Sequence, residues 1–139
     1  MGDDLLQMLN DTRGPINQLI GLEITAAAPE RVVGRLKIDP LRHHQPFGIV
    51  HGGVYCTMVE SLASIGAALN VMGEGKTAAG VENQTSFLRS LSEGTVEGVA
   101  TPLQMGRQMH LWQVEIRDQQ QRLVAHGRVR LFVRELPNG

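Results

Sequence analysis

The stretch His44-Gln45-Pro46-Phe47-Gly48-Ile49-Val50-His51-Gly52-Gly53 decides the fold of this chain, because it is typical of a loop that opens a long helix. From Gly53 to Asn70 no proline occurs, and Glu60 is the only charged residue. This pattern predicts a helix that is apolar on nearly all sides. Such a helix has to be buried, so the rest of the chain must wrap around it.

The start of this helix is a candidate site for negative charge. A helix that begins near His51 or Gly52 leaves its first N–H groups without partners inside the helix, ready to bind an anionic oxygen. The two glycines, Gly52 and Gly53, also let another molecule approach the backbone closely. We therefore expect a binding or catalytic function at this end.

Glu60 needs an explanation, since an isolated carboxylate in an apolar helix is costly to bury. The residues that share its helical stripe by three- and four-residue spacing are all small: Gly53, Cys56, Thr57, Ala63, Ser64 and Ala67. The opposite stripe is bulky and is expected to face the core: Val54, Met58, Ile65 and Leu69. Either another backbone or a ligand is expected beside Glu60; the alternative is a glutamate satisfied by an arginine or a capping group.

Length and composition set the broad class. The 139 residues suit a single domain over 1–139, with a helical segment over 1–20, that buries a core without disulfides. A net charge of −1 gives no reason to expect nucleic acid or a membrane surface as partner. The single cysteine, Cys56, and the acidic start Met1-Gly2-Asp3-Asp4 predict a cytoplasmic protein without a signal peptide.

The remaining pattern predicts strands around the helix. A short helix over 4–10 is expected to continue through 15–20 and to stop at Gly21. Alternating runs predict a hairpin of two strands before the central helix and four strands after it: 22–28, 31–38, 77–90, 94–105, 108–118 and 122–134. The expected fold is α+β, with an antiparallel sheet of about six strands wrapped around one long helix, the hotdog arrangement. An exposed edge strand would pair with a second copy, which predicts a homodimer.

Specific segments resemble a known family. Gln45 to Gly48, His51-Gly52-Gly53 and Glu60, supported by the later runs 83–89 and 106–112, resemble the hotdog-fold acyl-CoA thioesterases of the phenylacetate-degradation and hydroxybenzoyl-CoA (Arthrobacter-type) branch. The resemblance extends over about residues 21–133. It implies hydrolysis of an aryl or medium-chain acyl-CoA thioester at a dimer-interface site, with CoA as part of the substrate and no resident cofactor.

The resemblance also implies roles for individual residues. Glu60 would be the nucleophile or general base, and Gly52 would supply a backbone N–H to the oxyanion. Gln45 and His51 would position the thioester and the water, and Ser64 would support Glu60. Further candidates for contacts with the substrate lie in the same segments: Gly53, Asn83 and Ser86.

Helix geometry gives an independent argument about the site. Nine residues separate His51 from Glu60, which corresponds to roughly 13 Å along the axis and about half a turn around it. One helix cannot bring both to one carbonyl group. The spacing therefore predicts a composite site, in which the helix start of one subunit faces Glu60 of another.

The phosphates of CoA require positive charge near the pocket mouth. Arg89 and Arg107 are the candidates, because each lies near the end of an expected strand; ordinary solvated arginines are the alternative. Four histidines, His43, His44, His110 and His126, lack a companion cysteine or carboxylate cluster at zinc spacing, so no metal site is expected.

Other functions remain open from the sequence. A hotdog dehydratase or hydratase also joins a loop histidine to a helical acid, and a non-catalytic acyl-CoA-binding module would need no carboxylate at all. The segment from Gln45 to Gly53 favours the thioesterase. The dimers are further expected to pair into a tetramer, a dimer of dimers.

Overall fold

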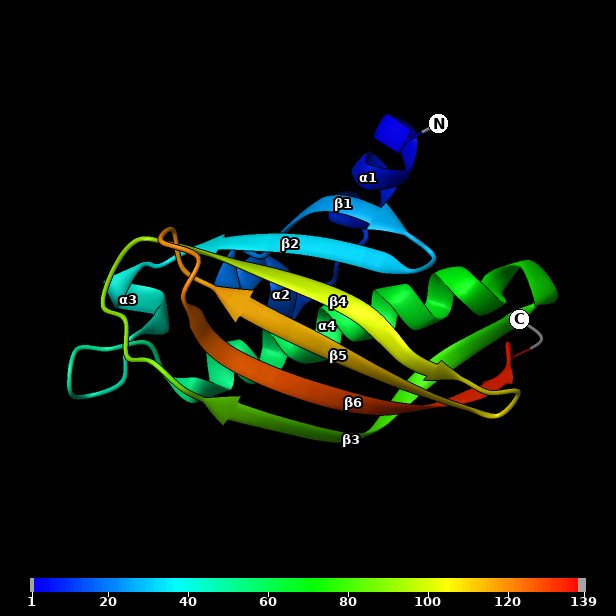
Figure 1. Ribbon diagram of the computed structural model, residues 1–139. Helices are drawn as coiled ribbons and strands as arrows, with labels where there is room; N and C mark the ends of the chain where they lie inside the picture. Colours follow the sequence, from blue (N-terminus) through cyan, green and yellow to red (C-terminus); the bar gives the residue numbers. More distant parts are fainter. Residues whose placement is uncertain (1, 138–139) are drawn as a thin grey trace.

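Six strands form one antiparallel sheet in the order β1-β2-β4-β5-β6-β3 (Figure 1). The computed structural model describes residues 2–137, so Met1, Asn138 and Gly139 of the predicted domain lie outside the described residues. The strands are β1 (Glu23–Ala28), β2 (Arg31–Lys37), β3 (Lys76–Phe87), β4 (Thr95–Met105), β5 (Met109–Arg117) and β6 (Leu123–Glu135). The helices are α1 (Gly2–Asp11), α2 (Pro15–Ile20), α3 (Pro40–His43), α4 (Gly52–Val71) and the short 3-10 helix η1 (Met72–Glu74).

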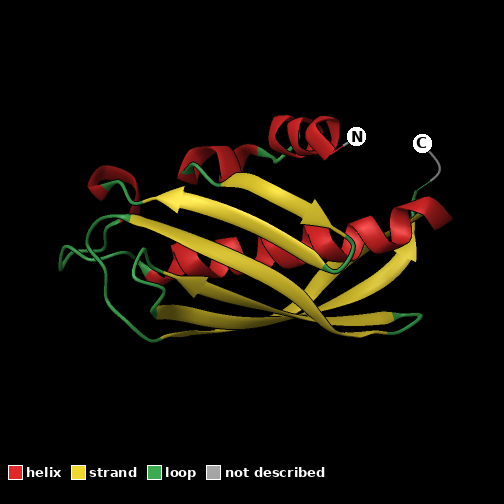
Figure 2. Ribbon diagram, turned by 45° about the horizontal axis from the view of Figure 1, so that its top comes forward, coloured by secondary structure: helices red, strands yellow, loops and turns green. Residues whose placement is uncertain are grey.

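Helix α4 is the centre of the fold. It contacts all six strands, and Figure 2 shows the curved sheet passing on both sides of it. The inward-facing residues of the sheet, among them Val96, Trp112 and Val129, are fully buried with Met58 and Leu62 of the helix. The predicted α+β hotdog fold is confirmed, because an apolar helix and one amphipathic sheet bury each other's apolar surface.

The predicted orientation of α4 was partly wrong. Ala63 and Ala67, assigned to the small stripe, are fully buried, whereas Ile65 and Leu69, assigned to the core, are only partly buried. The physical reason is the close approach of the sheet. The ring of Trp112 lies directly against Gly66, so small residues face the strands at this level of the helix.

Local chemistry corrects two other expectations. The strand expected over 77–90 ends at Phe87, and the N–H groups of Leu88 and Arg89 both donate to the carbonyl of Val124 as the chain leaves the sheet. The short helix α3 was not anticipated. Its start is capped by Asp39, whose side chain accepts from the Leu41 N–H at 2.9 Å.

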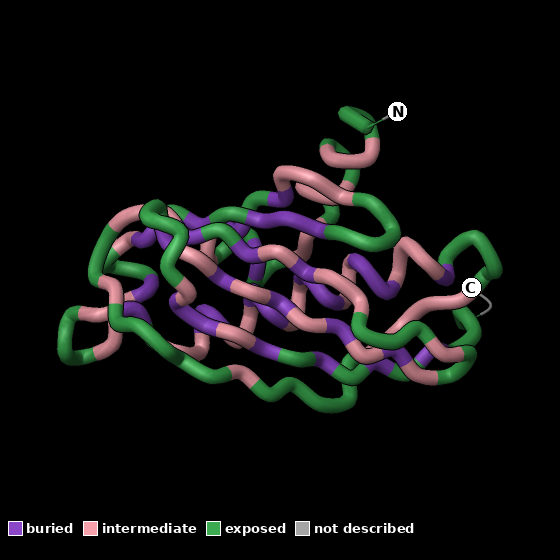
Figure 3. Tube along the Cα trace, in the orientation of Figure 1, coloured by how far each residue is buried: buried purple, intermediate pink, exposed green. Residues whose placement is uncertain are grey.

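The two edges of the sheet differ. At β1, the side-chain amide of Asn10 from α1 donates to the Ile24 carbonyl at 2.9 Å and accepts from the Ile24 N–H at 2.8 Å. Asn10 thus bonds the edge strand much as a neighbouring strand would. At β3 the second half of the strand is mostly exposed, as the green trace in Figure 3 shows, and the Val81 side chain is exposed. β3 is therefore the open edge.

Helix α4 together with η1, over Gly52–Glu74, is long and apolar enough to cross a membrane by length and composition alone. Half of its most apolar window is buried inside the fold, against the sheet. Its composition is therefore accounted for by its place in the core.

Replacement of Gly66 by valine is expected to lower the free energy of unfolding by about 1–3 kcal/mol, because the added side chain would overlap the Trp112 ring. Denaturant unfolding of the variant measures this change. Gly73→Val is the matched control, since a Cβ at Gly73 meets open space. Equal stability of the two variants would contradict the packing argument.

Candidate active site

The loop before α4 is held in a fixed shape by its own backbone. The Gln45 N–H donates to the Ile49 carbonyl at 2.8 Å, and the Gly48 N–H donates to the Gln45 carbonyl at 3.0 Å. Gly48 has a φ of 78°, a left-handed conformation that favours glycine. The Gln45 side-chain oxygen accepts from the Phe47 N–H, so the orientation of its amide is set. The NH₂ group of Gln45 is left as a donor toward a ligand.

His51 caps the helix. Its Nδ1 accepts from the Gly53 N–H at 2.8 Å, which places the proton of a neutral ring on Nε2. The Gly53 N–H is thus already used, which argues against Gly53 as a donor to the substrate. No hydrogen bond is found for the Gly52 N–H within residues 2–137. Gly52 therefore offers an available donor at this end of the helix, and its role at the oxyanion stays a prediction.

A cavity of about 250 Å³ opens beside this donor. The Phe87 ring, from the end of β3, lies over Gly52 so closely that a side chain at position 52 would overlap it. The lining brings together three of the predicted residues, Gln45, Gly52 and Arg89. The other lining residues are Ile49, Val50, Tyr55, Phe87, Leu88 and Ser90.

Tyr55 was not predicted from the sequence. Its side chain is 2% exposed, its ring centroid is 6.3 Å from that of Phe87, and its hydroxyl has no hydrogen-bond partner in the described part of the chain. Burial raises the pKa of Tyr55 to about 12. An aromatic residue in an apolar helix is typical of a core residue, so the sequence gives no sign that Tyr55 lines a cavity.

Glu60 lies about two turns further along α4, against the backbone of β3. Its carboxylate occupies the space where a side chain at Gly80 would be, and one oxygen, Oε2, is buried without a partner among residues 2–137. Burial raises the pKa of Glu60, and a hydrogen bond from the Asn83 side chain opposes this rise. The close neighbour predicted for Glu60 is thus the backbone of β3.

Asn83, rather than Ser64, is the polar neighbour of Glu60 in this structure. The Asn83 side-chain N–H also donates to the Cys56 carbonyl at 3.1 Å, and its oxygen accepts from the Thr85 hydroxyl at 2.7 Å. These contacts hold the amide in place. In the described residues no hydrogen bond joins Ser64 to Glu60, so the structure gives Ser64 no supporting role within one chain.

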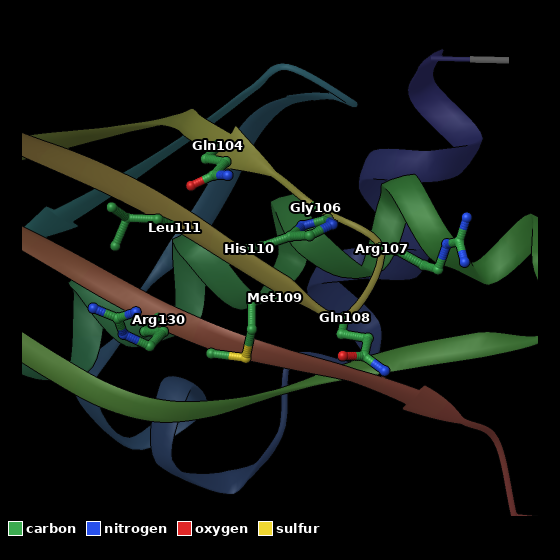
Figure 4. Close-up of a pocket in the computed structure, with 8 residues that line it drawn as sticks. All are labelled: Gln104, Gly106, Arg107, Gln108, Met109, His110, Leu111 and Arg130. Carbon is green, nitrogen blue, oxygen red and sulfur yellow. The ribbon is translucent and has the colours of Figure 1, made fainter.

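Two predicted residues lie elsewhere. Ser86 is exposed and pairs with His126, whose ring bonds Gln113 on the sheet face away from α4. Arg107 lies in the turn between β4 and β5 and lines a different cavity of about 530 Å³, which Arg130 lines from the opposite side (Figure 4). Within one chain, neither residue joins the cavity at the helix start.

The two chemical groups of the site do not meet in one chain. Eight residues separate Gly52 from Glu60, which corresponds to about 12 Å along the helix. A free N–H donor and a cavity lie at the start of α4, and a desolvated carboxylate lies near its middle. Among residues 2–137, no three His, Cys, Asp or Glu side chains gather as a metal site would require.

Comparison with known proteins identifies the family. The sequence profile of the thioesterase superfamily matches residues 47–125, which include the second part of the loop before α4, the helix α4 with Glu60, and β3. The chain belongs to the thioesterase superfamily. This confirms the prediction of a hotdog-fold thioester hydrolase.

Similar proteins of this superfamily cover most of the chain. It is 46% identical over 119 residues to Rv1847 of Mycobacterium tuberculosis, named as an esterase, with 84% of each chain covered. It is 34% identical over 125 residues to the proofreading thioesterase EntH of Cronobacter turicensis, with 89% of this chain and 90% of EntH covered. The solved structure of the thioesterase HI1161 from Haemophilus influenzae has a TM-score of 0.87 at 30% identity, covering 99% of this chain and 93% of that one.

Removal of the Asn83 side chain is expected to change the pH dependence of thioester hydrolysis. With Glu60 as the predicted base or nucleophile, its ionised carboxylate would be the active form, and Asn83 holds the pKa of Glu60 below the value that burial alone would give. In Asn83→Ala that pKa rises further, so the acidic limb of the rate profile moves to higher pH. Rates measured across the acidic range with one thioester would show the shift.

Gln84→Ala is the control, because Gln84 lies on the outer face of β3, where it accepts from Arg128. The acidic limb of the pH–rate profile of Gln84→Ala should match that of the wild type. If the pH–rate profiles of Asn83→Ala and Gln84→Ala had the same acidic limb, the role given to Asn83 would be refuted.

Proposed function

We propose that this protein hydrolyses acyl-CoA thioesters to the free acid and CoA, with aryl or medium-chain acyl groups as substrates. In this it would resemble the phenylacetate-degradation and hydroxybenzoyl-CoA branch of its superfamily. The observation that carries the proposal is the Glu60 carboxylate, which is desolvated and has one oxygen without a partner in residues 2–137. Nothing in the packing of the fold needs a charge there.

Glu60 has two possible roles in such a reaction. It can attack the thioester carbonyl, so that the C–S bond breaks, the CoA thiolate leaves and a mixed anhydride forms, which water then hydrolyses to the acid and the free Glu60 carboxylate. Alternatively, it can take a proton from a water that attacks the carbonyl as the CoA thiolate leaves. Both routes need the ionised form, and both develop negative charge on the carbonyl oxygen. The Gly52 N–H at the start of α4 would stabilise that charge, helped by the positive end of the helix dipole.

A homodimer would bring these groups together. The open edge strand β3 passes Glu60 at Gly80 and reaches the helix start at Phe87. If two β3 strands pair antiparallel around a two-fold axis near Asn83, Gly80 of one chain lies beside the Phe87 end of the other. The Gly52 N–H of one subunit then faces Glu60 of its partner, which supports the composite site.

The other residues take roles consistent with their places. Gln45 NH₂ and His51 Nε2–H are donors at the helix start, suited to orienting the thioester and the water. Arg89 lines the cavity and is suited to the phosphates of CoA. Arg107 and Ser86 would contact CoA only if they belonged to another subunit of the proposed homodimer or dimer of dimers. Ser64 would support Glu60 only after a change in side-chain conformation.

The names of two relatives support thioester chemistry. EntH is named a proofreading thioesterase, and HI1161 is named a thioesterase.

The thiol of Cys56 suits a reducing compartment. Cys56 is the only cysteine and is partly buried and unpaired. We place the reaction in the cytoplasm, where thiols stay reduced.

Glu60→Gln is expected to lower kcat by about 10²–10⁴-fold with little change in KM, because the amide keeps the shape but cannot act as base or nucleophile. The measurement is CoA release from benzoyl-, phenylacetyl-, hexanoyl- and lauroyl-CoA. Glu82→Gln is the control, since Glu82 is an exposed carboxylate on β3, the strand against which Glu60 packs, with one oxygen 3.7 Å from the Arg130 Nε. It should retain wild-type rates.

Two further measurements, with enoyl-CoA as substrate and of acyl-CoA binding, separate the alternative functions. Hydration of enoyl-CoA without CoA release would indicate the dehydratase or hydratase class. Tight binding of acyl-CoA by wild type and Glu60→Gln, with no turnover of any thioester, would indicate a binding module and would overturn the proposal.

Mixed dimers test the composite site. Glu60→Ala and Gln45→Ala chains, each inactive alone, are expected to recover about one quarter of wild-type activity after random exchange, because half of the dimers are mixed and each holds one intact site of two. Exchange of Glu60→Ala with Glu60→Gln is the control and should recover nothing. Mixed dimers verified by mass spectrometry that stay inactive would rule out a site shared between subunits.

A further inference from the structure

The ring of Phe87 is a partly exposed aromatic group with a specific neighbour. Phe87 is the last residue of β3, and its side chain is 54% exposed. One side of the ring, with the Cε2 and Cζ atoms, lies against Gly52 and fills the space that a side chain at position 52 would need. Position 52 therefore accepts only glycine while this ring is in place.

The stability of the fold does not account for this contact. A ring that keeps about half of its surface in water gains only part of the free energy of burial. Glycine is also a poor residue inside a helix, and Gly52 is the first residue of α4. The chain thus combines a partly exposed aromatic side chain and an unfavourable helix residue at a single contact. Such local conflicts are expected where a contact serves function.

The position of the ring is fixed from two sides. After Phe87 the chain leaves the sheet, and the N–H groups of the next two residues both donate to the carbonyl of Val124, at 2.8 and 3.1 Å. On the first turn of α4, the buried ring of Tyr55 has its centroid 6.3 Å from that of Phe87, with a tilt of 40°. The end of β3 and the first turn of α4 therefore hold the Phe87 ring beside the helix start.

The backbone N–H beside this ring is the free donor at the helix start. The Gly52 N–H has no hydrogen-bond partner in the described part of the chain, so water would otherwise occupy it. The carbon atoms of the Phe87 ring fill volume next to this donor and leave less room for water. A donor in a dry environment stabilises a developing negative charge more strongly than a donor in water.

We propose that Phe87 is a positioning residue for thioester hydrolysis, whose ring excludes water from the Gly52 N–H. The carbonyl oxygen of the substrate then meets this donor without a competing water. The inference rests on the proposed function, in which the Gly52 N–H is the oxyanion donor. It adds a residue that acts on the rate through that donor and not on the choice of acyl group.

Amide hydrogen exchange tests the exclusion of water without any substrate. In Phe87→Ala, exchange of the Gly52 N–H, measured by NMR, is expected to be about tenfold faster than in the wild type. The Gly53 N–H is the internal control, because it donates to the Nδ1 of His51 at 2.8 Å. Its exchange should change little. Equal acceleration of both amides would show that the whole helix start had loosened, and it would overturn the inference.

The kinetics of CoA release test the effect on the reaction. Loss of a whole oxyanion donor costs about 10²–10³-fold, so Phe87→Ala is expected to lower kcat about tenfold with KM changed by less than about twofold. Phe87→Leu retains part of the apolar bulk and should lie between Phe87→Ala and the wild type. Phe132→Ala is the matched control, because Phe132 is 43% exposed and alternates on β6 with the buried Leu131 and Val133. It should keep wild-type rates.

The outcomes separate the inference from the proposed function. Faster exchange of the Gly52 N–H alone, together with a lower kcat in Phe87→Ala, would support the inference. Unchanged exchange, an unchanged kcat, or a change in KM alone would overturn it and leave the thioesterase in place. Absence of CoA release from every thioester by the wild type would instead overturn the proposed function, and this inference with it.

Discussion

The closeness of α4 to the sheet is the constraint on which the rest of this structure depends. Leu62 projects from the helix into the space left by two glycines, Gly34 on β2 and Gly98 on β4. On the helix itself, Gly66 receives the ring of Trp112. Large side chains on one surface thus meet positions without side chains on the other. This interlocking fixes both the rotation of the helix and its position along the strands.

The close approach of α4 to the sheet also determines the surroundings of Glu60 and Gly52. At Gly80 the side chain that enters the glycine space is a carboxylate, so the tight packing that stabilises the rest of the helix strips water from Glu60. At Gly52 the arrangement is reversed, and the strand supplies the Phe87 ring that covers the helix start. Core packing and the site are therefore two results of one geometry.

Most of the architecture could be predicted from the sequence, because hydrophobic period and turn residues encode it directly. The uncharged run after Gly53 and the alternation along β6 needed no tertiary information. The rotation of α4 did need it, since the small size of Ala63 and Ala67 is equally compatible with facing a ligand or facing Trp112. The candidate site was predicted in part for the same reason. Gln45, Gly52 and Glu60 stand out locally. Tyr55 was not predicted, and Asn83 was expected at the substrate and not beside Glu60, because the place of each depends on neighbours distant in sequence.

Asn10 has a consequence for how copies of this chain can associate. By bonding Ile24 on both its N–H and its carbonyl, it occupies the edge of the sheet opposite β3. A sheet with two open edges can add chains without limit and grow into a fibre. Here joining two chains through β3 would use the open edge of each and leave a blocked strand at both ends. The side chain of Asn10, from a helix outside the sheet, thus blocks the outer hydrogen-bonding groups of β1 at Ile24, which would make such an assembly stop at two chains.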